Sequence, residues 1–412
     1  MANSVLTIDV IAKEALAILD NELVMAKRVH RGHESEFGNA MNGYQAGESI
    51  SIKRPTDFTV RDGATASAQD VVEGSVALTV DKQKGVDFAF TSKELTLNIK
   101  DLSERAIKPA MVQLANQIDR DLMALYSSVP NWIGTPGQTI NSFADFAKAP
   151  ERLDATAVPT DARSAALSPA DHWGLLGTQT GLFIQGAASG AYREGSLGKI
   201  GGVDTYMSQN VPTHTIGALG GTPLVNGAAQ VSTYASVKTT MIQNLITDGW
   251  TAAAAPRVKA GDVFTIAGVY DVNPVTKATL PHLKQFVVQS DASSDGLGNA
   301  TLSIYPAIIS SGAFQNVSAA PADNAALTFL GTASTGYAQN LVFHKNAFAL
   351  AMVPMVAPPG AVDVARHSYN GTSVRLIPFY NGSSDVSTFR LDVLYGVKAI
   401  DPRLATRVSG TA

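Results

Sequence analysis

The 412-residue chain contains no cysteine, little charge and no long uninterrupted hydrophobic run. The lack of cysteine excludes disulfides, thiolate metal ligands and a cysteine nucleophile. Charged residues make up 16% of the chain, against about 25% in an average soluble domain, while hydrophobic residues make up 45%. Because little charge is left to cover a free surface, this balance favours a protein that buries much of its surface against partners.

The net charge is −4, and lysine and arginine are spread along the chain. A dedicated nucleic-acid-binding surface needs clustered basic residues, so we do not expect one. The apolar run near the N-terminus is interrupted by Asp9, Lys13, Glu14 and Asp20, which argues against a signal peptide. No stretch approaches the length of a membrane span, and we expect synthesis in the cytoplasm without membrane association.

Catalytic, cofactor and metal motifs are also missing. The seven histidines are scattered, and the chain has no Gly-x-Ser-x-Gly elbow, dinucleotide fingerprint or Walker pattern. His30 and His33 have metal-like spacing but no third ligand nearby. Asp291, Asp295 and Asn299 miss the EF-hand pattern and fit a hairpin turn better. We therefore predict no catalytic residues, no cofactor, no metal and no enzymatic activity.

The clearest helix in the sequence covers residues 101–128. Apolar residues recur there every three or four positions, which places them on one stripe: Ile107, Met111, Leu114, Ile118, Leu122 and Leu125. Asp101 and Glu104 form a plausible capping box. Pro109 predicts that the helix bends or begins afresh at that position, because proline is tolerated only in the first turn.

A second amphipathic helix is expected over residues 4–28. Its apolar side holds Val5, Ile8, Ala12, Ala15, Leu16, Leu19 and Leu23. Such a helix packs either on its own domain or, as an arm, on a neighbouring molecule. The sequence does not decide between these two arrangements.

From residue 48 to residue 90 the apolar period changes to two, which predicts a long β-hairpin. Its middle, residues 55–74, has few large apolar side chains and cannot form a core of its own. The charged residues of this tip are Asp57, Arg61, Asp62, Asp70 and Glu73. The tip is therefore either a flexible loop or an arm stabilised by contact with another subunit.

The second half of the chain is rich in short strands. Residues 130–159 are Gly-, Ala- and Pro-rich, and Asn131, Trp132, Gly134 and Pro136 are interpreted as turn. Ser168 and Pro169 predict a helix start, with His172 on the surface of that helix. Between residues 216 and 340, strands are separated by turn signals such as Asp248-Gly249, which is typical of a small β-barrel or sandwich. Residues 374–380 and 388–395 predict a hairpin closed by Asn381-Gly382.

Several segments together resemble the coat (major capsid) proteins of tailed double-stranded-DNA phages, in the branch with an inserted β-barrel typified by short-tailed Salmonella phages. The segments are residues 88–95 (FAFTSKEL), 103–110 (SERAIKPA), 114–122 (LANQIDRDL), 192–196 (YREGS), 259–269 (KAGDVFTIAGV) and 394–397 (LYGV). No single segment is decisive. Their order and spacing cover nearly the whole chain.

The resemblance implies an α+β, Hong Kong 97-type capsid fold with an inserted small β-barrel. It implies an N-terminal arm (1–47), an E-loop hairpin (48–93), a peripheral domain with a spine helix (94–130), an axial domain in two parts (131–215 and 341–368), an inserted barrel (216–340) and C-terminal peripheral strands (369–412). The charged hairpin tip becomes an intersubunit contact. Residues 227–237 carry no charge, which departs from the charged inserted loop of the family and puts that two-fold contact in doubt.

The function implied is a major capsid protein that self-assembles, as pentamers and hexamers, into the icosahedral head around double-stranded DNA. The resemblance also implies a scaffolding protein and a portal as partners, a decoration protein as an optional further one, and only non-specific contact with DNA. The alternatives are an encapsulin-like compartment shell and a β-rich phage tail or adhesin component.

Overall fold

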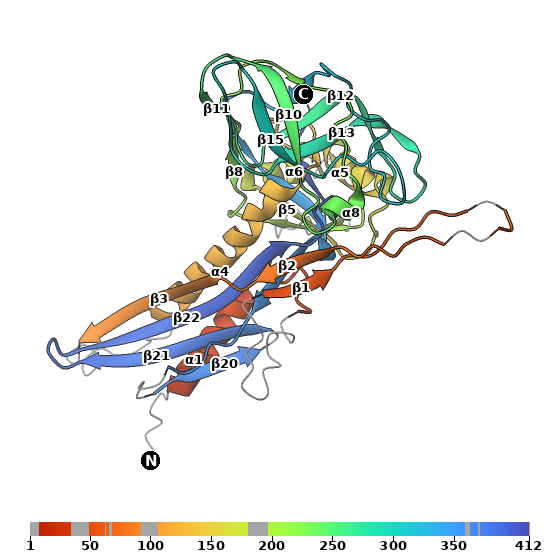
Figure 1. The fold of residues 1–412 in the computed structure, drawn as a ribbon. Helices are drawn as coiled ribbons and strands as arrows, with labels where there is room; N and C mark the ends of the chain where they lie inside the picture. The colour runs from red at the N-terminus through yellow and green to blue at the C-terminus, as the bar shows by residue number, and fades with distance from the viewer. Residues whose placement is uncertain are drawn as a thin grey trace. The chain divides into compact units, whose positions relative to one another are not determined.

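The structure is a computed structural model that describes residues 8–33, 49–61, 63–65, 68–91, 106–179, 197–358, 363–369 and 371–411. The chain divides into two compact units. One contains Met1–Ser51, Ala77–Met123 and Phe348–Lys398, and the other contains Ile52–Val76, Ala124–Ala347 and Ala399–Ala412. Figure 1 traces the elements of both units.

Two helices form one layer of the first unit: α1 (Ile8–Glu22) and α4 (Lys108–Met123). They pack on one another, and α1 also contacts β20 and β21 of the same unit. The side chain of Asp119 on α4 accepts hydrogen bonds from the backbone N–H groups of Val24 (2.9 Å) and Ala26 (3.0 Å), just after α1 ends. The N-terminal helix therefore packs on its own unit, the first of the two arrangements left open by the sequence.

The regular α-helix α4 starts at Lys108, next to Pro109 as predicted, and residues 106–107 before it are π-helical. The proposed capping box of Asp101 and Glu104 lies outside the described residues. Buried residues of the predicted stripe are Ile107, Met111, Leu114, Ile118 and Leu122. Leu125 is only half-buried, because the chain tightens after Met123 into the 3-10 helix η2 (Ala124–Ser128) and leaves the α-helical spacing. Met123 is buried at this end of the stripe instead.

The sheet of the first unit is built around one long strand. Its strand order is β19-β22-β21-β20, and β3 also pairs with β22. The bounds are β3 (Lys82–Thr91), β19 (Phe348–Met352), β20 (Ala365–Tyr369), β21 (Thr372–Asn381) and β22 (Val386–Ala399). The β21–β22 hairpin closes at Asn381 and Val386, which confirms the predicted Asn381-Gly382 turn.

The predicted hairpin over residues 48–90 is shorter than the alternating pattern indicated. Only β1 (Ser49–Lys53) and β2 (Ser75–Thr79) pair with one another. Strand β3 turns away and pairs antiparallel with β22 along its whole length, from Lys82 opposite Tyr395 to Thr91 opposite Val386. The period-two pattern of β3 was therefore correct, but its partner lies some 300 residues later and cannot be found from local alternation.

In the second unit, a mixed sheet has the order β4-β23-β18-β5-β7-β6. The bounds are β4 (Trp132–Ile133), β5 (Arg163–Leu167), β6 (Lys199–Ile200), β7 (Val203–Met207), β18 (Asn340–His344) and β23 (Ala405–Val408). Two short 3-10 helices, η3 (Lys345–Ala347) and η4 (Pro402–Leu404), follow β18 and precede β23. Every residue of β5, β18 and β23 is buried, as expected for central strands.

Two helices accompany this sheet, α5 (Phe143–Ala155) and α6 (Pro169–Gln179). Helix α5 was not predicted, and it buries Phe146, Ala149 and Leu153 in the core of the sheet. Trp132, interpreted as turn, instead lies buried in β4. Helix α6 begins at Pro169 as predicted. The prediction that His172 lies on the helix surface is wrong, because His172 is only 4% exposed, whereas Trp173 beside it is 57% exposed.

A six-stranded antiparallel sheet of order β16-β12-β13-β15-β10-β9 forms the inserted barrel. The bounds are β9 (Gly221–Val225), β10 (Gln243–Trp250), β12 (Val263–Val272), β13 (Thr279–Val288), β15 (Ala300–Tyr305) and β16 (Leu327–Phe329). An isolated bridge joins Leu224 on β9 to Ala326, the residue directly before β16, so the barrel is nearly closed.

Smaller elements complete the barrel. They are β8 (Thr213–Thr215) paired with β17 (Gly336–Ala338), β11 (Ala255–Val258) paired with β14 (Ala292–Ser294), and the short helix α8 (Tyr234–Val237). The predicted turn at Asp248-Gly249 is wrong, because both residues lie inside β10 at a bulge, where Gly249 has φ of +71°. Asp295 does form the expected hairpin turn, accepting from the Asn299 N–H at 2.8 Å.

Candidate intersubunit site

The arm, defined here as residues 54–74, continues from β1 and β2 as two extended segments (Figure 1). At its root the Arg54 N–H donates to the Gly74 carbonyl at 2.8 Å. Lys53 and Glu73 form an exposed ion pair at 2.6 Å next to that bond. Contact with Glu73 raises the pKa of Lys53. These contacts hold the two segments together where they leave the sheet.

Further along, the described residues of the arm are joined by side-chain hydrogen bonds. Gln69 accepts from the Thr59 N–H at 2.9 Å and from its hydroxyl at 3.0 Å, while the Gln69 amide donates to the Thr59 carbonyl at 2.6 Å. Arg61 donates to the carbonyls of Gly63 and, at 2.9 Å, Thr65. All five residues are exposed, so this part of the arm has no apolar core.

The five charged residues predicted at the tip are not equivalent. Arg61 and Asp70 are exposed on the arm, and Glu73 is paired with Lys53. Asp57 is half-buried and lies at the root, where it lines a cavity of the second unit. Asp62 lies outside the described residues. The structure thus separates Asp57 from the exposed charges of the arm.

Sequence reasoning missed the exposed apolar side chains of the same arm. Phe58 is 56% exposed, Val60 98% and Val71 63%. The prediction considered only the charged residues of this segment. The apolar residues at positions 58 and 60, within an otherwise polar segment, already indicated a contact surface. A contact made by this arm therefore has apolar groups to bury as well as charges to pair.

The cavity at the root of the arm has a volume of about 260 Å³. Arg54 and Asp57 line it from the arm, and Lys277 from the turn between β12 and β13. Arg403 lines it from η4 and forms a two-bond ion pair with Asp401, at 2.9 and 2.8 Å. Although burial alone raises the pKa of Asp401, the Arg403 guanidinium holds it below its usual value.

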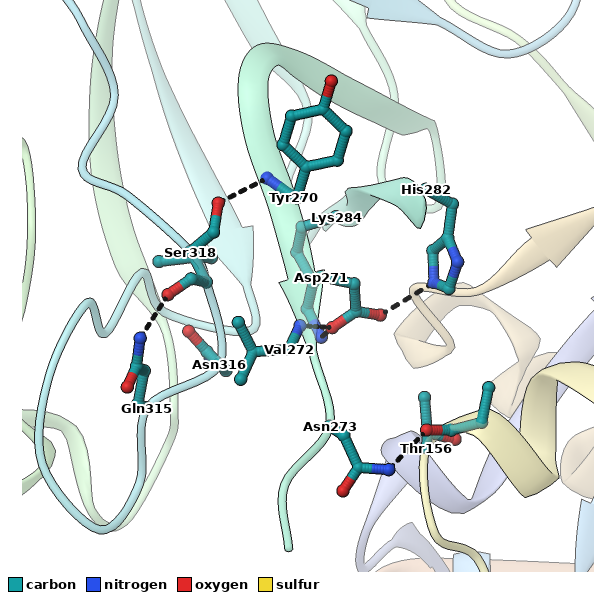
Figure 2. Close-up of polar contacts among 12 residues, drawn as sticks. Thr156, Tyr270, Asp271, Val272, Asn273, His282, Lys284, Gln315, Asn316 and Ser318 are labelled. Carbon is teal, nitrogen blue, oxygen red and sulfur yellow. Dashed lines mark hydrogen bonds and ion pairs between the residues drawn. The ribbon is translucent and has the colours of Figure 1, made fainter. Parts of the chain in front are cut away.

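A buried ion-pair network forms another wall of this cavity (Figure 2). Asp271 on β12 accepts from the Lys284 ammonium at 2.8 Å and contacts His282 at 3.3 Å, both on β13. Burial by itself raises the pKa of Asp271, but Lys284 and His282 outweigh it and lower the pKa to about 2. Directly after β12, the Asn273 amide donates to the Ala155 carbonyl at the end of α5 at 2.9 Å and so joins the barrel to that helix.

A second polar network lies where β8 enters the barrel. His214 Nε2 is 2.8 Å from an Asp262 oxygen, and its Nδ1 is 3.0 Å from the Tyr126 hydroxyl. The Arg407 guanidinium lies over the rings of Tyr126 and Trp132 and donates to the Gly261 carbonyl. Full burial lowers the pKa of Arg407 to about 9. Sequence reasoning found none of these contacts, because the residues come from four distant segments.

The described residues contain neither a candidate metal site nor a candidate membrane helix. In these residues, no three His, Asp or Glu side chains lie close enough together to hold a metal ion. None of the helices in these ranges has the length and apolar character needed to cross a membrane. His30 and His33 lie with their ring centroids 4.8 Å apart.

A helix-on-sheet unit, a projecting arm without its own core and a barrel inserted into a second sheet are the parts of a subunit that builds a viral shell. The family comparison agrees with this class. The chain belongs to the P22 coat protein family, whose model, described as "P22 coat protein - gene protein 5", matches residues 1–408.

The chain is also similar to individual proteins. A major capsid protein of Acyrthosiphon pisum secondary endosymbiont phage 1 is 22% identical over 417 residues, covering 97% of each chain. Among solved structures, a chain of Mycobacterium phage Che8 covers 93% of this chain and 90% of its own, at 14% identity and a TM-score of 0.48. The virus-like particle from Pyrococcus furiosus covers 97% of both chains, at 9% identity and a TM-score of 0.39. The family assignment does not depend on these structural likenesses.

Family membership decides between the functions considered from the sequence. The chain is a major capsid protein, which self-associates to form a phage head shell and is a component of the virion. It is a structural protein and not an enzyme. The predicted fold class, an α+β capsid fold of Hong Kong 97 type with an inserted small barrel, is confirmed by the family and by the observed sheets. The predicted domain boundaries and contact residues stay predictions.

Proposed function

We propose that the shell is built from pentamers and hexamers in which the arm of each copy lies on a neighbouring copy. The observation that carries this proposal is the exposure of Phe58, Val60 and Val71 on a segment with no core of its own. An isolated arm of this kind gains little from folding, whereas burying three apolar side chains against a neighbour is favourable. Arg61 and Asp70 then supply polar contacts at the edge of the interface.

The domain boundaries of the resemblance belong to the same proposal. Residues 48–93 are the E-loop, 94–130 the spine region, 216–340 the inserted barrel, and 131–215 with 341–368 the axial domain. Residues 1–47 are the N-terminal arm and 369–412 the last peripheral strands. The near-closure of the barrel between Leu224 and Ala326 supports the inserted domain as a separate folding unit.

The proposed partners are a scaffolding protein and a portal during assembly, an optional decoration protein on the finished shell, and double-stranded DNA inside it. Contact with DNA is non-specific in this proposal. The net charge of −4 supports that view, because an acidic container releases its DNA more readily than a basic one.

The test is assembly of arm variants, followed by negative-stain microscopy with and without the scaffolding protein. Phe58→Ser combined with Val60→Ser is expected to leave a folded subunit that forms few or no closed shells. The matched control is Leu297→Ser, an 85% exposed apolar side chain on a barrel turn, which is expected to assemble normally. Closed shells from the arm variant at the yield of the unmodified chain would contradict the proposed arm contact.

A further inference from the structure

The cavity at the root of the arm holds more cationic than anionic groups. Its described lining contains four cations, Arg54, Lys277, Lys284 and Arg403, against three carboxylates, Asp57, Asp271 and Asp401. Lys284 is paired with Asp271, and Arg403 with Asp401. The charge of Asp57 acts on Lys277. Arg54 acts in the same way on Asp401, which is already paired with Arg403, and Arg54 has no ion pair of its own among the described residues.

The position of Arg54 is fixed by the backbone, and its side chain lacks a described acceptor. Its N–H is bonded to Gly74 at 2.8 Å, which pins the residue at the root of the arm. Its Nε atom is buried, and no group in the described part of the chain accepts a hydrogen bond from it. Burying a guanidinium N–H group without an acceptor costs free energy. A ligand that supplies a hydrogen-bond acceptor therefore binds favourably there.

Lys277 brings a second set of donors to the same cavity. Its ammonium donates to the Ala313 carbonyl, and an ammonium has three donors in all. Burial lowers the pKa of Lys277; the Asp57 carboxylate opposes this shift, and the Arg403 guanidinium adds to it. Like charges held together in a partly buried cavity are relieved by an anion between them.

We propose that this cavity is a binding site for one small oxyanion, a phosphate or a carboxylate, held by Arg54 and Lys277. A volume of about 260 Å³ accommodates such a group. The bound anion joins the root of the arm, through Arg54, to the barrel turn that carries Lys277. Anion binding thereby makes the attachment of the arm to the barrel depend on the anions in solution.

The test is thermal unfolding of the full chain in inorganic phosphate and, separately, in acetate, each against chloride at equal ionic strength. At least one oxyanion is expected to raise the melting temperature above the chloride value. Arg54→Gln and Lys277→Gln are each expected to raise the dissociation constant of the anion about tenfold, because each removes one charge-assisted hydrogen bond. Comparing the two salts distinguishes a phosphate site from a carboxylate site.

The control is Lys53→Gln, which removes a neighbouring cation that faces Glu73 and does not line the cavity. This variant is expected to bind the anion as the unmodified chain does. Line broadening of the phosphate signal in phosphorus NMR measures binding independently of stability, so a variant that is merely less stable is recognised. The proposal would be overturned if neither oxyanion raised the melting temperature above its value in chloride. It would also be overturned if Lys53→Gln and Arg54→Gln lost equal anion affinity.

Discussion

Asp271 is a buried charge of the barrel that depends on its ion-pair partners. It is fully buried and holds the Lys284 ammonium at 2.8 Å, so Asp271→Asn leaves a cation buried without its partner. Removing one member of a buried ion pair costs about 3 kcal/mol. We expect Asp271→Asn to lower the free energy of unfolding by that amount at neutral pH. Urea unfolding followed by the fluorescence of Trp250, which is in the barrel core, measures it.

The effect of this variant should depend on pH. The pKa of Asp271 is lowered from 3.8 to about 2 in the folded chain, so its carboxylate stabilises the fold above about pH 4 and loses that contribution as the pH falls through 2. The contribution is about 2 kcal/mol. The difference between Asp271→Asn and the unmodified chain should therefore shrink below pH 4. Asp204→Asn, an exposed carboxylate on β7, serves as the control and should have little effect at any pH.

At the scale of elements, helix α5 depends on an N-terminal cap formed by Ser142. The Ser142 hydroxyl accepts from the Asp145 N–H at 3.1 Å and donates to the Asp145 carboxylate at 2.8 Å. Ser142→Ala is expected to destabilise the second unit by about 1 kcal/mol. Ser142→Thr keeps the hydroxyl and should retain most of the stability. Hydrogen exchange of the α5 amides checks this, and equal protection in both variants would show that the cap contributes nothing.

Local signals were sufficient for elements whose partners are close in sequence. Pro109, the Ser168–Pro169 start and the Asn381-Gly382 turn were all read correctly, because each depends on the chemistry of one or two residues. Helix α5 was missed because a Gly-, Ala- and Pro-rich composition outweighed its Ser142 cap and the spacing of Phe146, Ala149 and Leu153. The pairing of β3 with β22 and the position of Asp57 away from the exposed tip depend on tertiary contacts. No local pattern contains that information.

For the whole molecule, the low charge content and the exposed apolar residues of the arm point to the same source of shell stability. If Phe58, Val60 and Val71 supply most of the arm contact, screening of charges should not release subunits. The Debye length falls from about 10 Å at 0.1 M salt to about 3 Å at 1 M, which weakens exposed ion pairs but not apolar burial.

We therefore expect preformed shells to stay intact when salt is raised over that range, as measured by the fraction of protein that sediments as particles. Arg61→Gln combined with Asp70→Asn should give shells with the same urea resistance as the unmodified chain, because exposed ion pairs contribute little. Phe58→Ser alone should lower that resistance, because a phenyl group is no longer buried at each contact. Release of subunits by salt, together with fragile shells from the charge variant, would instead assign the contact to the charged residues that the sequence first indicated.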